Sequence, residues 1–271
     1  MTDPAGAAPT GAQPFRRAAG ATPYHRLNPL TKLVAAVATS LAGVAIGGVV
    51  GPLALAGLVV LLPAAVARVV RKLLRATLLL TLPVATSVLV INVLFFPGGR
   101  DVLFQAGPVT ATREGLGLAI EVLLRLLVIS GAISLFYLTT SAAELTTDLE
   151  RRGVSPRLAF VANASVQSVP AMLERAAAII EAQRARGLDT EGGPLARARG
   201  IVPIVGPVIL GAIGEVEQRT LALEARGFSR PGPRTLLWHP ADRPIERAAR
   251  WLIVAALVAL LAARALGWHP A

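Results

Sequence analysis

The sequence predicts an all-α integral membrane protein, with about five transmembrane helices and a group of cytoplasmic helices inserted between spans four and five. Hydrophobic residues make up 54% of the 271 residues and charged residues only 16%, whereas a soluble domain carries about 25% charged residues. The surplus of alanine, leucine and valine is gathered in long runs. The basic residues, which give a net charge of +11, lie between these runs, as they do in the cytoplasmic loops of membrane proteins.

Five hydrophobic runs predict transmembrane helices. About 20 apolar residues are needed, because a helix rises about 1.5 Å per residue and the hydrocarbon core is about 30 Å thick. Trp251 and Trp268 flank the last run, as aromatic anchors do at membrane interfaces. The predicted spans cover about residues 30–50, 52–67, 76–96, 116–138 and 251–266.

The distribution of basic residues between the spans predicts a cytoplasmic N-terminus. No basic residue lies in the turn between spans one and two, and the loop between spans three and four holds only Arg100 and Arg113. The stretch 139–250 carries fifteen arginines, so we expect it to be cytoplasmic. The other basic residues on this side precede the first span or separate the second from the third; they are Arg16, Arg17, Arg26, Lys32, Arg68, Arg71, Lys72 and Arg75.

These signals divide the chain into four regions. Residues 1–23 are rich in alanine, proline, glycine and threonine, and we expect a disordered cytoplasmic segment there. Residues 24–140 are expected to form a four-span transmembrane region and residues 141–250 a cytoplasmic helical region. Residues 251–271 then form the final transmembrane helix and a short tail.

The cytoplasmic region opens with two helix signals. Ser141 and Glu144 form a capping box for a helix that we expect to end at Gly153. The pair at 155–156 supplies a serine cap and a first-turn proline, and the helix that it starts runs to Gly187.

Three prolines interrupt the rest of this region. Pro170 is expected to break or kink the second helix. Residues 201–213 are apolar but too short to span a membrane, and they contain Pro203 and Pro207. This segment therefore fits a helix that lies against the membrane or packs on the spans. A charged helix is expected to follow it and to end at Arg226.

Two of these helices are expected to end in the same triplet, Ala185-Arg186-Gly187 and Ala225-Arg226-Gly227. The structural interpretation is that arginine offsets the negative end of the helix dipole and glycine closes the last turn. The functional interpretation is contact with a partner that has acidic grooves, because alanine permits close approach and the arginine fork suits carboxylates. A third copy, Ala198-Arg199-Gly200, is not expected to share that role.

The spans contain few polar residues. Glu121 and Arg125 lie one turn apart in the fourth span and predict an ion pair, because a lone charge at mid-membrane costs about 2.5–3.5 kcal/mol on insertion scales. We interpret the pair as a structural clamp, with an ion pathway as the alternative. Asn92 predicts a hydrogen bond between helices, and glycines at four-residue spacing from Gly43 to Gly51 predict close helix packing.

The sequence offers no catalytic constellation, metal site or cofactor motif. It has no cysteine, its three histidines lack the spacing of metal ligands, and neither lysine belongs to a phosphate-binding loop. Its basic residues form no stripe with aromatic residues, which argues against a nucleic-acid partner. One alternative function is a self-contained permease that uses Glu121, Arg125 and Asn92. Another is an integral-membrane lipid-modifying enzyme, although Asp148 and Glu150, the nearest acidic pair, are expected at an exposed helix end.

Four segments carry a family resemblance. They are "HRLNPLTKL" before the first span, "TTSAAELTTDLERRGVSP" after the fourth, and the triplet segments "EAQRARG" and "LALEARGF". In order, spacing and membrane context they resemble the T component (EcfT/CbiQ-like), the transmembrane energy-coupling subunit of energy-coupling factor (ECF) transporters. The resemblance covers about residue 24 to the end of the chain.

The resemblance implies a subunit of an ECF-type ABC importer in the bacterial cell membrane. In that family the T component joins two ABC-type ATPase subunits to a membrane-embedded, substrate-binding S component. It implies that residues 185–187 and 225–227 engage the ATPases, with Arg184 and Glu224 as possible supporting residues. ATP-driven closure of the ATPases would then tilt the S component for uptake of a vitamin or a transition-metal ion. ATP hydrolysis belongs to the partners, so the chain itself is expected to be no enzyme.

Overall fold

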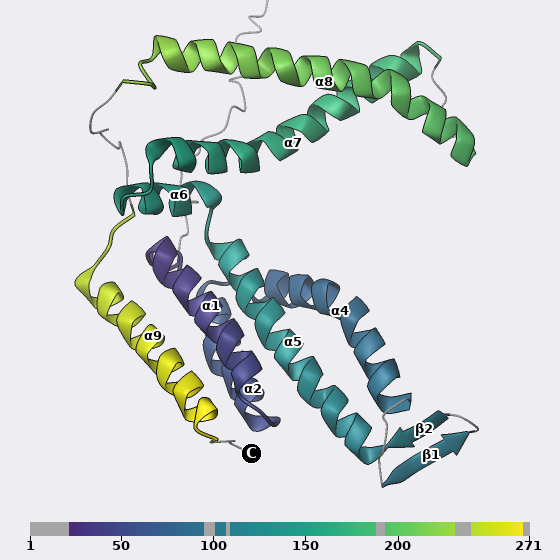
Figure 1. Ribbon diagram of the computed structural model, residues 1–271, viewed down its shortest axis with the longest axis vertical. Coiled ribbons are helices and arrows are strands. Elements are labelled where there is room, and N and C mark those ends of the chain that lie inside the picture. The colour runs from purple at the N-terminus through teal and green to yellow at the C-terminus, as the bar shows by residue number, and fades with distance from the viewer. Residues whose placement is uncertain (1–21, 95–100, 107–108, 188–192, 231–239, 268–271) are drawn as a thin grey trace, which may run out of the picture. The chain divides into compact units, whose positions relative to one another are not determined.

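The computed structural model describes residues 22–94, 101–106, 109–187, 193–230 and 240–267. Within these ranges the elements are helices and one two-stranded hairpin (Figure 1). The predicted class, an all-α membrane protein, is confirmed, and the short hairpin is an addition that the sequence reasoning missed. Most of the segment predicted to be disordered, as well as Trp268, lies outside the described residues.

The chain divides into two units. One comprises Met1–Leu149 with Pro240–Ala271, and the other comprises Glu150–His239. The second unit therefore contains most of the region that the sequence predicts to be cytoplasmic. The region boundaries at residues 140 and 250 stay predictions.

The first two predicted spans are two apolar helical stretches shorter than a standard membrane span. Helix α1 (Pro29–Ala45) has 17 residues, and a turn with Gly48 at φ +73° follows it. The second stretch is continuous through α2 (Val50–Ala54), the π-helical η1 (Leu55–Leu61) and α3 (Leu62–Val66).

Three further helices are long and apolar enough to cross a membrane. They are α4 (Val70–Leu94), α5 (Arg113–Thr139) and α9 (Pro244–Ala265). Strands β1 (Val102–Ala106) and β2 (Val109–Thr112) form an antiparallel hairpin between α4 and α5. The hydroxyl of Thr112 then caps α5 by accepting from the Gly115 backbone N–H at 3.2 Å.

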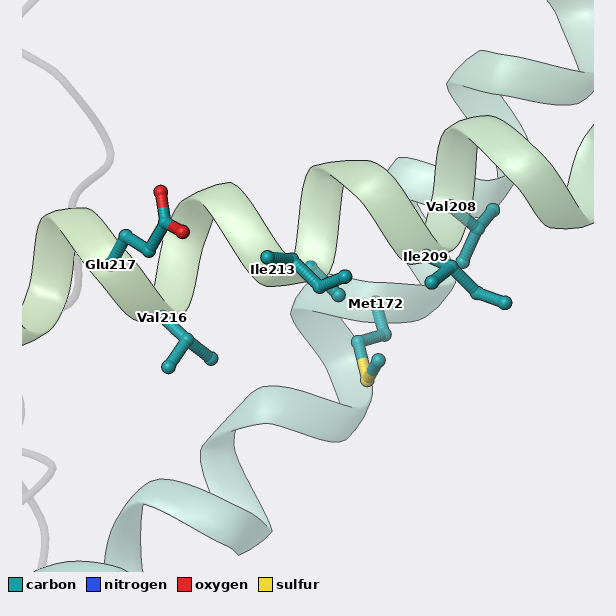
Figure 2. Close-up of a pocket in the computed structure, with 7 residues that line it drawn as sticks. Met172, Val208, Ile209, Ile213, Val216 and Glu217 are labelled. Atoms are coloured by element: carbon teal, nitrogen blue, oxygen red, sulfur yellow. The ribbon is translucent and has the colours of Figure 1, made fainter.

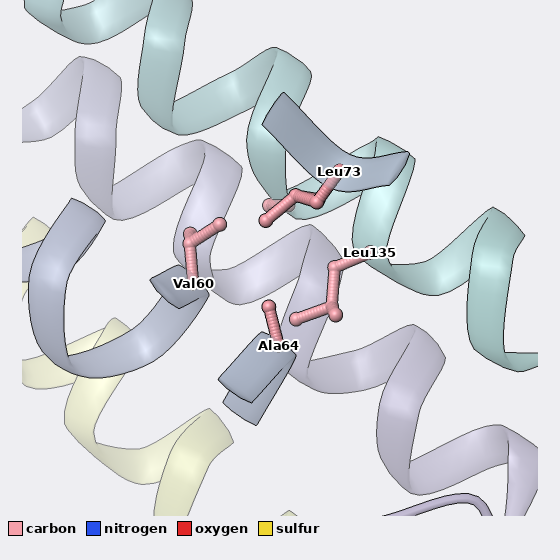
Figure 3. Packing of buried hydrophobic residues seen from close by; sticks show 5 residues of the cluster. Val60, Ala64, Leu73 and Leu135 are labelled. Carbon is pink, nitrogen blue, oxygen red and sulfur yellow. The ribbon is translucent and has the colours of Figure 1, made fainter. Parts of the chain in front are cut away.

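The core of the first unit lies where α4 and α5 meet the second apolar stretch. Figure 3 shows Val60, Ala64, Leu73 and Leu135 pointing toward one another. Most other large apolar side chains of α4 are exposed, as expected for a surface that faces lipid rather than water. The first unit therefore has a small internal core inside a wide apolar exterior.

The remaining helices are α6 (Ala142–Arg151), α7 (Pro156–Ala185) and α8 (Pro194–Ala225). The serine parts of both predicted caps form, since Ser141 and Ser155 accept backbone N–H groups at 3.2 Å and 3.3 Å. Helix α7 continues through its internal proline, and α8 continues through two. The prediction of a short apolar segment followed by a separate charged helix is therefore wrong, because both are parts of the single 32-residue helix α8.

Candidate functional site

Helix α7 ends at the first triplet. Ala185 is its last residue, and Arg186 is the C-cap with φ −91° and ψ 8°. Gly187 follows in the left-handed region at φ +90°, and its N–H donates to the carbonyl of Arg184 at 2.9 Å. A Cβ at Gly187 would meet no atom within 4 Å, so backbone conformation rather than space favours glycine here.

Helix α8 ends in the same way at the second triplet. Ala225 is its last residue, Arg226 is the C-cap with φ −86° and ψ 5°, and Gly227 has φ +72°. Two bonds close this end, from the Gly227 N–H to Glu224 O and from the Phe228 N–H to Leu223 O, each at 2.9 Å. These contacts are the pattern of a Schellman helix end.

The arginine side chains at both ends point out without a partner among the described residues. Arg186 and Arg226 are exposed, and neither side chain forms a hydrogen bond or ion pair in the described part of the chain. Both neighbours named as supporting residues, Arg184 and Glu224, are exposed as well. The third triplet, at residues 198–200, lies inside α8 and ends no helix, so only the two other copies share this geometry.

The two arginine ends lie far apart. The rings of Phe160, near the start of α7, and Phe228, just after α8, are 5.0 Å apart between centroids. The end of α8 is therefore close to the beginning of α7, and Figure 1 shows the two helices crossing. From Phe160 to Arg186 the helix rises by about 1.5 Å per residue. The ends of α7 and α8 are therefore on the order of 40 Å apart.

An ion-pair cluster joins α7 to α8 where they cross. Arg175 on α7 donates to one oxygen of Glu215 on α8 at 2.6 Å, and Arg219 donates to the other oxygen at 2.8 Å. The hydrogen bond from Arg175, with its positive charge and that of Arg219, lowers the pKa of the Glu215 carboxyl below its usual 4.5. The carboxylate therefore stays ionised at neutral pH and links the helices.

Beside this cluster lies an apolar groove of about 350 Å³. Figure 2 shows Met172 of α7 facing a row of side chains on α8. The groove is open to the surroundings, and the side chains of Met172, Ile209 and Ile213 remain between 42% and 52% exposed. Its full lining is Met172, Val208, Ile209, Ala212, Ile213, Val216 and Glu217. Met172 therefore lines an open groove rather than a closed interior.

In the first unit, the predicted pair of Glu121 and Arg125 forms within α5. The guanidinium donates to a carboxylate oxygen at 2.5 Å, and the same oxygen accepts the Gly48 N–H at 2.9 Å. Glu121 therefore fastens the turn after α1 to α5. This contact supports the interpretation of the pair as a structural clamp.

A buried polar cluster at the start of α1 escaped the sequence reasoning. Asn28 caps α1 by accepting the Leu30 N–H at 3.0 Å, and its side-chain amide donates to Asp148 of α6 at 3.1 Å. Its backbone N–H donates to Glu246 of α9 at 2.8 Å. Asn28 and Asp148 are fully buried. Asp148 is therefore no part of an exposed helix end, and that prediction is wrong because it judged α6 without its tertiary partners.

Arg250 and Lys32 complete this cluster. Arg250 donates to Thr31 at 3.0 Å and to Asp242 at 2.9 Å. The Lys32 ammonium donates to the carbonyl of Thr139 at 2.8 Å, and the lysine is 2% exposed. The segment "HRLNPLTKL" thus ties α1 to α5, α6 and α9. The sequence does show an asparagine at a helix N-cap, Asn28, close to Lys32. Their hydrogen-bond partners lie too far away in the chain to be identified from the sequence.

Two other expectations are settled by local geometry. Asn92 donates to the carbonyl of Val88 in its own helix at 2.9 Å, so the predicted bond between helices is wrong. A helix carbonyl one turn back was the nearer acceptor.

A Cβ at Gly43 would lie 2.9 Å from Val128 of α5, so the predicted close packing is confirmed there. Among the described residues, no three histidine or acidic side chains gather as metal ligands would.

Comparison with known proteins gives a consistent result. Residues 20–236 match the family described as cobalt transport protein, CbiQ. The protein named energy-coupling factor transporter transmembrane protein EcfT from Acidaminococcus fermentans is 31% identical over 257 residues, covering 88% of this chain and 91% of the relative. Its namesake from Heliobacterium modesticaldum is 31% identical over 76% of this chain and 80% of the relative. The one from Exiguobacterium sibiricum is 35% identical, but the match spans 55% of this chain and 59% of the relative.

Proposed function

This chain belongs to the CbiQ family, whose relatives are named as transmembrane proteins of ECF transporters, and we propose that it couples partner ATPases to a substrate-binding S component. It is a multi-pass membrane protein of such a transporter. In the proposal, ATP binding and hydrolysis occur on two ABC-type ATPase subunits. The cargo is a vitamin or a transition-metal ion, selected by the S component.

The observation that carries the proposal is the pair of matching helix ends. Arg186 and Arg226 are exposed C-caps with no partner in the described residues. A guanidinium group suits a carboxylate or a set of backbone carbonyls on another protein. Two such ends about 40 Å apart fit one ATPase each, and residues 185–187 and 225–227 would enter their grooves. Arg184 and Glu224 would flank these contacts.

The groove between α7 and α8 supports a second contact, with the S component. A surface that faces water rarely exposes a contiguous apolar patch of this kind. Val216, in the groove lining, is 64% exposed, and Leu210, elsewhere on α8, is 72% exposed. A membrane-embedded partner would cover such side chains. Because Arg175 and Glu215 link α7 to α8 at the crossing, a pull on either helix end would reach the groove.

The proposal places α7 and α8 in the cytoplasm together with the N-terminus. The fifteen arginines of residues 139–250 support this side, since basic residues concentrate in cytoplasmic loops. Residues 141–250 would then act as the coupling region between four spans and the last one. The clamp of Glu121 with Arg125 would hold the turn after α1 against α5 within the transmembrane unit.

The decisive test reverses the two charges. The variant Arg186→Glu with Arg226→Glu is expected to insert in the membrane normally but to lose the ATPases in a pull-down of the detergent-solubilised complex. Each single variant is expected to lose part of the ATPase signal, because each end serves one subunit. Truncating one partner of a buried charged contact costs about 2–5 kcal/mol, so the double loss should be nearly complete.

A matched control reverses two other exposed arginines, Arg113→Glu with Arg243→Glu, neither of which lies at the end of α7 or α8. It changes the net charge by the same amount and should retain both ATPases. Full retention of ATPases by the variant at residues 186 and 226 would refute the proposed role of the arginines. Equal loss in both variants would assign the effect to net charge and would also refute it.

A further inference from the structure

A second group of basic residues lies at the start of α4 and takes no part in the proposed coupling. Arg68, Arg71, Lys72 and Arg75 are all exposed, and in the described residues none of their side chains forms an ion pair or hydrogen bond. From residue 4 to residue 100 the sequence contains no aspartate or glutamate. The four cations therefore have no nearby carboxylate along their own segment of chain.

Three of these cations, Arg71, Lys72 and Arg75, lie on the exposed side of α4. Arg71, Arg75, Leu78 and Leu82 follow one another at spacings of three or four residues, which places them on one stripe of the helix. The two leucines are 55% and 60% exposed, as residues that face lipid are. The opposite face of α4 is buried against α5 and η1, at Leu73, Thr77 and Thr81.

The backbone at Arg68 adds an independent observation. Arg68 has φ +57°, and it is the one residue other than glycine with a positive φ in the described part of the chain. Glycine holds five other such positions. A left-handed conformation costs a residue with a Cβ about 1–2 kcal/mol. The left-handed arginine therefore marks this turn as a candidate functional position, because such strain clusters at functional sites.

We propose that the turn from α3 to α4 is a binding site for the headgroup of an anionic phospholipid such as phosphatidylglycerol. The phosphate would be held by the guanidinium groups of Arg71 and Arg75, with Arg68 and Lys72 beside them, and the acyl chains would lie along Leu78 and Leu82. Arginine binds phosphate through two parallel hydrogen bonds, and basic groups beside a transmembrane helix attract anionic lipid. This site needs only that α4 enters the bilayer, and it is independent of ATPase coupling.

The stripe argues for a lipid rather than for soluble phosphate or a protein. Arg71 and Arg75 form one continuous face with the exposed Leu78 and Leu82, so a ligand that covers this face must present an anion and an apolar chain together. A soluble anion has no apolar part that could contact the leucines. The positive charges alone would suffice to orient the helix in the membrane, but that role does not require a left-handed arginine.

The test measures lipid binding to the full-length chain, purified in detergent and stripped of lipid. Native mass spectrometry would count bound phosphatidylglycerol and, separately, phosphatidylcholine with the same acyl chains. The variant Arg71→Gln, Lys72→Gln, Arg75→Gln is expected to bind phosphatidylglycerol on the order of 100-fold more weakly, because each cation near the membrane contributes about a fivefold effect. A matched variant, Arg157→Gln, Arg230→Gln, Arg243→Gln, lowers the net charge equally and should bind it as the wild type does.

Arg68→Gly provides a second variant that is expected to fold at least as well as the wild type, because glycine relieves the strained backbone. It should melt at the same or a higher temperature and yet bind phosphatidylglycerol about fivefold more weakly. Equal affinity of the wild type for phosphatidylcholine would overturn the proposal. So would wild-type phosphatidylglycerol binding by the Arg71, Lys72 and Arg75 variant or by Arg68→Gly, or an equal loss in the matched variant.

Discussion

The side-chain amide of Asn28 donates to the carboxylate of Asp148 at 3.1 Å, although 120 residues separate them. Both residues are fully buried. Asn28 also accepts a hydrogen bond from the Leu30 N–H at the start of α1 and donates its backbone N–H to Glu246 of α9. Helices α1, α6 and α9 of the first unit therefore meet at this asparagine. A single side chain thereby fixes the end of α6 to the transmembrane helices.

We predict that Asn28→Ala lowers the free energy of unfolding by about 1–3 kcal/mol, because it removes an N-cap and leaves buried acceptors with fewer donors. The measurement is thermal unfolding of the purified chain in detergent, followed by circular dichroism. Asn92→Ala is the matched control, since Asn92 bonds only a carbonyl of its own helix and should change stability by less than about 0.5 kcal/mol. Equal effects of the two variants would contradict this role for Asn28.

The second prediction concerns the glycines that end α7 and α8. Gly187→Ala and Gly227→Ala should each loosen the last helical turn by about 1 kcal/mol, because both glycines have positive φ and alanine is strained there. Hydrogen exchange of the amides in that turn should speed up about fivefold. Gly214→Ala, inside α8 with open space around its Cβ position, should slow exchange instead. Faster exchange in all three variants would show that the left-handed backbone is not the cause.

A pH dependence follows from the ion pair at the crossing of α7 and α8. The pKa of Glu215 is lowered in the folded protein. Its ionised carboxylate therefore stabilises the α7–α8 crossing fully above the ordinary carboxyl pKa near 4.5, and this stabilisation is lost as pH falls through the lowered pKa. The contact between α7 and α8 should therefore stay the same from about pH 8 down to about pH 5. It should loosen in more acidic solution.

Spin labels on α7 and α8 would measure this directly. The chain has no cysteine, so cysteines introduced at the exposed positions of Leu173 and Leu210 carry the only labels. The distance distribution between them should broaden in acid. Glu215→Gln should broaden it at every pH and remove the pH dependence, whereas Glu217→Gln should behave as the wild type. A wild-type transition near neutral pH would contradict the assignment to Glu215.

Local signals in the sequence were sufficient for the helix ends. Ser141, Ser155 and the two Arg-Gly pairs act on backbone groups within four residues, so their effect can be read from adjacent residues. The pair of Glu121 and Arg125 is equally local, being one turn apart in a single helix. What could not be predicted was the third partner of that pair, the Gly48 N–H, which belongs to a distant turn.

Tertiary context explains the errors. Asp148 appears at the polar end of a short helix and was expected to be exposed, but its burial depends on Asn28, far away in the chain. The prolines at 203 and 207 were expected to interrupt a helix, yet α8 continues through both. Proline removes one hydrogen bond and kinks a helix without always ending it. The roles of Arg186 and Arg226 toward ATPases stay predictions, because they depend on partners outside the chain.

The last prediction tests how closely α1 and α5 approach. A Cβ on Gly43 would lie 2.9 Å from Cγ1 and 3.3 Å from Cβ of Val128, which is fully buried. Valine in a helix has one strongly preferred rotamer and yields little, so Gly43→Ala should cost about 1–3 kcal/mol by overpacking. Val128→Ala alone should also destabilise the protein, since it leaves a cavity. The double variant should be more stable than the sum of the single effects predicts, by about 1 kcal/mol. Thermal unfolding of all four proteins completes the cycle, and simple additivity would mean that the two helices move apart at little cost.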